Sequence, residues 1–138
     1  MISFVVPGVP VGKGRPRFAK RGNFVSTYTP ERTASYENLV KVLAMQAMKG
    51  TQPLPYPVRV VIDVAICPPA SWSKKKRAQA LNGETYPTGK PDIDNVAKGI
   101  LDAMNGVVYL DDKQVISLTI RKFYRDSDYA FVRVEIEQ

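Results

Sequence analysis

The sequence predicts one small α/β (α+β) domain over residues 1–138, with a mixed β-sheet flanked by helices. Two observations predict this fold class. Segments in which apolar and polar residues alternate, as in half-buried strands, are interspersed with segments that carry apolar residues at helical spacing. The chain has 138 residues, the size of one ordinary domain, and its hydrophobic fraction of 44% suffices for a packed core.

The first part of the chain predicts a strand, a basic loop and a helix. Ile2–Val6 is mostly apolar and ends at Pro7-Gly8, which indicates a strand. Residues 13–22 are rich in glycine, proline and cations, so we expect a loop there. Thr29-Pro30-Glu31 is typical of a helix start, and this helix should run to about Lys49, with Gly50 just past its end. Its inner face is expected to carry Leu39, Val42, Leu43, Gln46 and Ala47.

The middle of the chain predicts a strand and two helices. Val58–Ile66 alternates with period two and predicts a strand, with Cys67 as a small buried residue in it. Ser71 or Ser73 is expected to cap a short helix over Lys74–Leu81. A further helix follows the acidic segment, because apolar residues there recur at helical spacing. These residues are Ile93, Val96, Ala97, Ile100, Leu101 and Met104.

The last third predicts a short extended piece and two strands. Val107–Leu110 is expected to be extended, and Asp111-Asp112 to form a turn. The segments from Ile116 to Arg121 and from Val132 to Ile136 alternate with period two. We expect these two strands to run antiparallel to each other.

The composition favours a polyanionic partner and excludes several kinds of catalysis. The formal net charge is +7, and nucleic acid is the commonest partner of such basic chains. The chain has no histidine, so Ser-His-Asp triads, Cys-His pairs and histidine-ligated zinc are excluded. With one cysteine, no internal disulfide forms. Hydrolytic chemistry would therefore depend on carboxylates, lysine and metal.

The chain shows no sign of a membrane or secretory destination. It has no apolar run long enough to span a bilayer, and Met1–Pro7 lacks the basic region of a signal peptide. We expect a cytoplasmic protein without a membrane partner.

Five aspartates follow Lys90 closely, which is unusual in a basic chain. They are Asp92, Asp94, Asp102, Asp111 and Asp112. Carboxylate oxygens suit Mg²⁺ or Mn²⁺, and nearby cations suit phosphate. On the predicted helix, Asp94, Lys98 and Asp102 form a row beside the apolar stripe. Asp92 is expected at or before the helix cap, from where its carboxylate can converge with that of Asp94.

A structural interpretation of the same aspartates is possible. An aspartate at a helix start is usually a cap, and Asp94 with Lys98 is usually a surface ion pair. Asp111-Asp112 alone is most often a turn. Capping does not explain why all of these occur together.

The acidic segment resembles the signature of the RusA family of Holliday junction resolvases, which are common in prophages. The resemblance rests on Pro91 to Gly106, with Asp92-X-Asp94-Asn95 and Lys98, and on Tyr109 to Val115. It extends loosely over most of the chain through the Gly8-X-Pro10 turn and the helix start at Tyr28-Thr29-Pro30. The family fold is a small mixed α/β domain that acts as a homodimer on branched DNA, with Mg²⁺ as cofactor and Mn²⁺ as a possible substitute.

The resemblance also implies residue roles. Asp92, Asp94 and Asp112 would be catalytic, metal-binding carboxylates and Lys98 the catalytic lysine, with Asp102 and Asp111 as secondary candidates. Mg²⁺ on the three carboxylates would polarise the phosphate and activate water, and Lys98 would stabilise charge or orient the water. The number of metal ions stays open. Relatives can carry a cation where this chain has Pro91, and Lys90 is the candidate to supply that charge. A symmetric homodimer suits a junction that must be cut on two opposed strands.

Two basic runs are candidates for DNA contact. Lys13, Arg15, Arg17, Lys20 and Arg21 surround Phe18, which could stack on bases or wedge at the branch point. A solvated loop is the other interpretation of this run. Lys74, Lys75 and Lys76 form the second run, which is equally well a solvated helix face.

Three other functions are compatible with parts of the sequence. A nucleic-acid-binding protein without activity explains the charge but not the acidic cluster. A restriction-type nuclease expects an acidic residue two positions before lysine on a strand, whereas Lys98 follows Asp94 by one helical turn. A metal-dependent nucleotide hydrolase would not need the basic loop.

Overall fold

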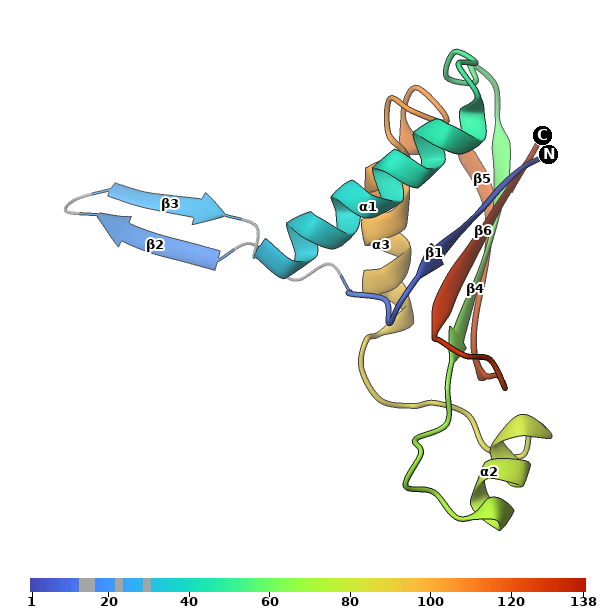
Figure 1. Ribbon diagram of the computed structural model, residues 1–138. Coiled ribbons are helices and arrows are strands. Elements are labelled where there is room, and N and C mark those ends of the chain that lie inside the picture. The colour runs from blue at the N-terminus through green and yellow to red at the C-terminus, as the bar shows by residue number, and fades with distance from the viewer. Residues whose placement is uncertain (13–16, 22–23, 29–30) are drawn as a thin grey trace.

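The computed structural model describes residues 1–12, 17–21, 24–28 and 31–138, and its centre is a four-stranded mixed sheet (Figure 1). The strand order is β1-β6-β4-β5. Strand β6 is antiparallel to both neighbours, and β4 is parallel to β5. The strands span Ile2–Pro7 (β1), Val58–Ile66 (β4), Val115–Tyr124 (β5) and Phe131–Glu137 (β6). The predicted α+β class with a mixed sheet is confirmed.

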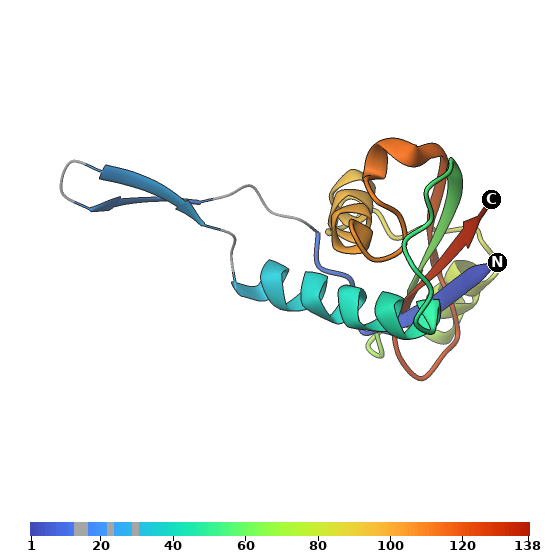
Figure 2. The same cartoon turned by 90° about the horizontal axis from the view of Figure 1, so that it is seen from above.

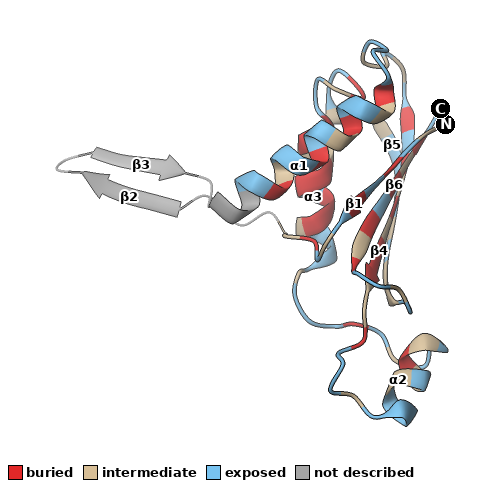
Figure 3. Ribbon diagram, in the orientation of Figure 1, coloured by how far each residue is buried: buried red, intermediate tan, exposed pale blue. Residues whose placement is uncertain are grey.

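Two helices, α1 (Glu31–Met48) and α3 (Ile93–Met104), lie side by side on one face of this sheet (Figures 1 and 2). Buried residues concentrate where the two helices meet the sheet (Figure 3). The inward-facing residues of β4 are almost fully buried, and each contributes about 1.5–3 kcal/mol of transfer free energy. The core is built mainly by Val58, Val60, Ile62, Val64, Val96, Ile100, Met104, Val132, Val134 and Ile136. The core therefore fixes α3 against the sheet.

A third helix, α2 (Lys74–Leu81), lies beyond one end of the sheet (Figure 1). Ser73 is its N-cap and accepts a hydrogen bond from the backbone N–H of Lys76, which confirms one of the two predicted caps. Cys67 follows β4 rather than lying in it, and it is only half-buried. Its thiol is 3.4 Å from the backbone oxygen of Ser127. The expectation of a buried strand residue is wrong because the strand ends one residue earlier.

The basic loop expected at residues 13–22 is partly wrong. Residues 17–21 form β2 (Arg17–Arg21), which pairs antiparallel with β3 (Phe24–Tyr28). The β-branched and aromatic residues of Phe24–Tyr28 favour a strand, and a partner strand satisfies its backbone groups. The hairpin stands apart from the four-stranded sheet (Figure 1). Lys13 and Arg15, and the predicted cap and first turn at Thr29-Pro30, lie outside the described residues.

Helix α1 ends as predicted, but it buries a different face. Gly50 follows its end with a positive φ of 78°. Among its described residues, Tyr36, Val40, Ala44 and Met48 are buried; of the predicted inner face, Leu43 and Ala47 are half-buried against the core, whereas Leu39, Val42 and Gln46 are exposed. Apolar residues occur on more than one side of this helix, so their spacing does not determine which side meets the sheet.

The last part of the chain follows the prediction with two differences. Residues 106–108 form a turn, because Val107 and Val108 donate backbone hydrogen bonds to Met104 at the end of α3, and of the predicted extended piece only Tyr109 forms a β-bridge, with Leu54. Strands β5 and β6 run in opposite directions, but β4 lies between them. Within the described residues, no helix has the length and apolar character needed to cross a membrane.

Candidate functional site at the two ends of helix α3

The N-terminal end of α3 presents two exposed carboxylates. Asp92 occupies the N-cap position in extended conformation, yet its side chain makes no capping hydrogen bond. Its backbone oxygen accepts the N–H of Val96 at 3.0 Å, so the helix begins there without using the carboxylate. Asp94 lies in the first turn and is also exposed. The simple capping interpretation therefore does not describe Asp92.

The loop before Asp92 is held by a residue that sequence analysis missed. Lys122 Nζ donates to the backbone oxygens of Gly89 at 2.8 Å and Pro91 at 3.2 Å. Lys122 pairs with the buried Val64 in the sheet and therefore lies on the helix-covered side of β5. Lys122 lies on the same side of β5 as Leu118 and Ile120. A lysine in this otherwise apolar series is the sequence signal that could have identified it. The peptide bond between Lys90 and Pro91 is cis.

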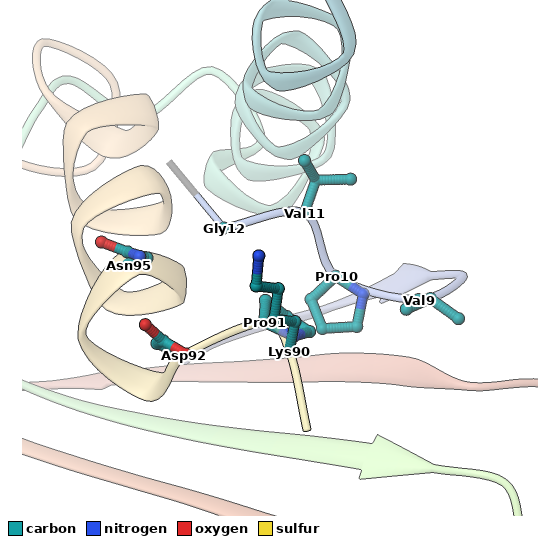
Figure 4. Close-up of a pocket in the computed structure, with 8 residues that line it drawn as sticks. All are labelled: Val9, Pro10, Val11, Gly12, Lys90, Pro91, Asp92 and Asn95. Atoms are coloured by element: carbon teal, nitrogen blue, oxygen red, sulfur yellow. The ribbon is translucent and has the colours of Figure 1, made fainter. Parts of the chain in front are cut away.

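An open pocket of about 420 Å³ adjoins this end of α3 (Figure 4). The pocket is lined by residues 9–12, residues 90–92 and Asn95. The side chains of Lys90 and Asp92 point toward it. Residues 9–12 pack closely on the helix, since a Cβ at Gly12 would lie 3.0 Å from the Cβ of Asn95. In the sequence, the basic run begins at Lys13, directly after Gly12. The described backbone places Arg17, Phe18, Lys20 and Arg21 on β2.

The C-terminal end of α3 holds two further carboxylates on a fixed turn. Asp111 caps a short 3₁₀ turn (η1, Asp112–Gln114) by accepting the N–H of Lys113 at 3.0 Å. Gln114 closes this turn: its Oε1 accepts the N–H groups of Leu110 and Asp111, both at 2.9 Å. Its Nε2 donates to the oxygens of Leu54 and Tyr56 at 2.7 and 3.0 Å. The turn expected at Asp111-Asp112 is thus present.

Gln114 is a second residue that sequence analysis missed. The spacing of Asp111 and Gln114 is that of a capping box, and this was the available signal. Nearby, the buried Tyr109 donates its hydroxyl to the oxygen of Leu101 at 2.7 Å, which joins the segment after α3 to the helix. The carboxylates of this end therefore sit on a well-supported segment.

Negative charge is crowded at the C-terminal end. Partial burial raises the pKa of Asp112. The pKa is raised further by Asp111, through a hydrogen bond and its charge, and by the charge of Asp102. A hydrogen bond from Asn105 acts in the opposite direction and lowers the pKa. The N–H of Lys113 lowers the pKa of Asp111. Asp112 is therefore costly to ionise, and a cation beside it would favour its charged form.

The helix separates the two sets of carboxylates. Asp94 and Asp102 are two turns apart, about 12 Å along the axis. Asp112 hydrogen-bonds to Asn105 at the far end, which puts it still farther from Asp94. Lys98 is exposed between them, and no ion pair with Asp94 is among those of the described residues.

Carboxylate oxygens are the ligands that Mg²⁺ prefers, so the chemistry of these residues fits a divalent metal. Their arrangement in one chain fits less well. Among the described residues, no group of three or more Asp, Glu or Cys side chains lies close enough to hold a metal ion. The predicted set of Asp92, Asp94 and Asp112 is brought together only in part: the first two share one end of α3, and the third lies at the other end with Asp102 and Asp111.

The second basic run lies on α2, away from the sheet-bound helices (Figure 1). Lys74, Lys75 and Lys76 are all exposed. The amine of Lys76 lies 4.2 Å from the ring centre of Trp72, which also packs edge-on against Tyr124. Trp72 therefore serves packing, and this run is exposed to solvent.

Comparisons with known proteins bear on the whole chain. Residues 7–137 match the family model described as endodeoxyribonuclease RusA. The uncharacterized protein YqaN of Bacillus subtilis (strain 168) is 38% identical over 137 residues, which cover 98% of this chain and 93% of the relative.

Proposed function

Since the chain belongs to the RusA family of endodeoxyribonucleases, which implies Holliday junction resolvase activity, we propose that it is a Mg²⁺-dependent enzyme that cuts four-way junctions. The proposed reaction is hydrolysis of one phosphodiester bond in each of two opposed strands, at symmetric positions. We propose that the enzyme acts in DNA recombination and repair in the cytoplasm and that a prophage encodes it.

The observation that carries the mechanism is the free carboxylate of Asp92. A cap position that does not use its side chain for capping leaves both oxygens available to a ligand. Asp94 adds a second exposed carboxylate in the first turn of the helix, and Lys90 adds a cation at the neighbouring pocket (Figure 4). Acidic groups beside cations are what a metal-assisted reaction on a phosphate needs.

In this proposal Asp92, Asp94 and Asp112 hold the metal, with Asp102 and Asp111 as secondary residues. When bound, Mg²⁺ or Mn²⁺ supplies Lewis acidity at the phosphate and a more acidic water. Lys98 stabilises negative charge that develops on the phosphate. The cations of the segment 13–21 and Lys90 bind DNA phosphates, which position the junction without reading its sequence. Phe18 stacks or wedges at the branch point, and Lys74, Lys75 and Lys76 are a secondary contact.

The proposed enzyme acts as a homodimer. A four-way junction has two-fold symmetry, and a two-fold dimer presents two equivalent sites to its two opposed strands. This proposal predicts paired cleavage of the two strands.

A labelled synthetic four-way junction tests the function. Wild type and Asp94→Asn are incubated with the junction, with and without Mg²⁺, and a linear duplex of the same sequence serves as the control. Paired symmetric nicks that need the junction, the metal and Asp94 support the proposal. Tight junction binding without nicks in Mg²⁺ or Mn²⁺ would replace it with a binding function.

A further inference from the structure

We infer that the face of the four-stranded sheet opposite α1 and α3 binds an unpaired strand of DNA. The site is centred on Phe131 and is separate from the carboxylates of α3, so it does not depend on the proposed cleavage. None of the described helices or strands covers this face (Figures 1 and 2). The surface is therefore open to a ligand.

An aromatic strip, made of Phe131, Ala65 and Phe123, crosses this face. Phe131 of β6 and Phe123 of β5 both pair with Ala65 of β4 between them, so the three side chains leave the sheet on one side. Ala65 is fully buried although no helix lies over it, which means that its neighbours' side chains close above it. The two phenylalanines are half-buried and about 10 Å apart, two strand spacings.

Each phenylalanine of the strip has an arginine beside it. The Cζ atom of Arg125 lies 5.6 Å from the ring centre of Phe131, and that of Arg121 lies 5.5 Å from the ring centre of Phe123. Tyr129 packs edge-on against Phe131, with 6.1 Å between ring centres, and is 55% exposed. Aromatic faces beside guanidinium groups suit the bases and phosphates of a nucleic-acid strand.

An open hollow of about 360 Å³ adjoins the Phe131 end of the strip. The described residues that line it combine cations, aromatic rings and a hydroxyl, with no acidic side chain among them: Ser3, Val5, Arg125, Tyr129, Phe131 and Arg133. Arg133 is held by Glu135 at 2.7 Å. Arg125 has no ion pair with any described carboxylate, so its guanidinium is available to a phosphate.

A second open hollow, of about 490 Å³, adjoins the Phe123 end of the strip. Arg121 and Phe123 line it from β5, and the exposed Tyr86 lines it from the loop after α2. Arg121 is held by Asp63 at 3.0 Å, and its side chain remains 65% exposed. Both ends of the strip thus offer a cation next to an aromatic ring, which suits a ligand that repeats a base and a phosphate.

The ligand that this surface fits is an unpaired strand rather than a duplex. In a duplex the bases stack on one another, so a sheet surface reaches phosphates and base edges but no base face. An unpaired strand can turn its bases onto aromatic side chains, and every base has a face that stacks. Since the family consists of endodeoxyribonucleases, the strand is DNA.

Binding measured by fluorescence anisotropy, without divalent metal, tests the inference on the full chain. The ligands are a labelled single strand of about 12 nucleotides, an abasic strand of the same length and a duplex of the same sequence. Phe131→Leu keeps an apolar side chain and should raise the Kd for the single strand about tenfold, while the Kd values for the abasic strand and the duplex stay unchanged. Urea unfolding checks that this variant is folded.

A second variant tests the phosphate contact without touching the packed strip. Arg125→Gln should weaken binding of the single strand and lower the slope of log Kd against log salt concentration by about 0.7, the value for one phosphate contact on a single strand. Arg59→Gln is the matched control, because Arg59 is exposed on the same face of β4, about 20 Å from Ala65. It should change neither quantity.

Two results would overturn the inference. One is unchanged binding of the single strand by both Phe131→Leu and Arg125→Gln. The other is an equal loss of duplex and single-strand binding in Phe131→Leu, which would make this face a duplex contact. No cleavage is measured, so an inactive nuclease would contradict the proposed function and leave this test intact.

Photo-cross-linking locates the strand directly. A single strand that carries iodinated deoxyuridine is irradiated with the protein, and the modified peptides are identified by mass spectrometry. We expect cross-links at Phe123, Tyr129 or Phe131. Cross-links confined to residues 13–28, or none on this face of the sheet, would contradict the site.

Discussion

The two ends of helix α3 hold similar carboxylates in different ways. At the N-terminal end, Asp92 and Asp94 are exposed, and the preceding loop is tied to the sheet by Lys122 alone among the described side chains. At the C-terminal end, Asp111 caps a 3₁₀ turn that Gln114 fixes through four hydrogen bonds. Asp112 sits there among other carboxylates, with a raised pKa.

The difference indicates a division of roles. The N-terminal end offers ligand groups at an open pocket, close to Lys90, and in the proposed function this end receives the phosphate. The C-terminal end offers ligand groups whose mutual repulsion a cation would relieve. Neither end alone has all three of the carboxylates that the family resemblance implies.

The largest expected effect is the loss of a carboxylate at either end. Asp94→Asn and Asp112→Asn should each lower the rate of junction cleavage by about 10³-fold or more, because each removes a carboxylate of the proposed metal site. Binding should persist, since cations dominate affinity for DNA. Cleavage rates and gel shifts measure both. Asp128→Asn, at an exposed position before β6, is the control. Full activity in either variant would contradict the comparison.

A smaller loss is expected from Lys98, which lies between the two ends. Lys98→Met should lower the cleavage rate by about 10²-fold, the usual cost of one group that stabilises transition-state charge. Lys98→Arg keeps the charge and should recover part of the rate. Single-turnover rates at saturating protein separate this effect from binding. If Lys98→Arg cleaved as slowly as Lys98→Met, the role of Lys98 would not be electrostatic.

The two ends should also differ in stability. Gln114→Leu leaves two backbone N–H groups and two carbonyls without their partner and should lower the free energy of unfolding by about 1–3 kcal/mol. Lys122→Met removes two bonds at the other end and should cost less, about 0.5–1.5 kcal/mol. Urea unfolding curves give both values. A larger loss for Lys122→Met would mean that the N-terminal end is the more firmly held.

The smallest effect concerns the charge of Asp112. Its pKa is raised in the folded chain, so its ionisation opposes folding above its ordinary pKa and ceases to do so in acid. Asp112→Asn should therefore raise the melting temperature of the metal-free protein by about 1–2 °C at neutral pH, with the gain lost in acid. In excess Mg²⁺ the wild type should have the higher melting temperature, because the bound ion stabilises the wild type and not Asp112→Asn. Calorimetry at two pH values decides the sign.

Much of the fold was predictable because its signals are local. The alternation in β4, the Ser73 cap of α2 and the helical spacing of α3 each specify an element without reference to the rest of the chain. The hairpin was missed because the cations of Arg17–Arg21 hide its alternation. The orientation of α1 was missed because apolar residues occur on several of its sides, and only packing against the sheet selects one.

The sequence identifies the candidate residues of the site but not how the fold arranges them. The Asp-X-Asp-Asn motif and the Asp-Asp turn identify chemical groups, whereas their separation depends on where the chain runs after α3. Lys122 and Gln114 act on carbonyls that are distant in the sequence, so no local pattern reveals their partners. The resemblance names carboxylates, and the straight helix between them is what shows that one chain keeps them apart.

The most direct test of the account uses a supercoiled plasmid that extrudes a cruciform, which is a four-way junction held in a closed circle. With Mg²⁺, two cuts made in one binding event convert the plasmid to a linear product, whereas a single cut gives a relaxed circle. The account predicts linear product from the wild type, and no linear product from Asp94→Asn or Asp112→Asn. Relaxed circles from the wild type, or no cutting at all, would contradict a paired resolvase built on the two ends of α3.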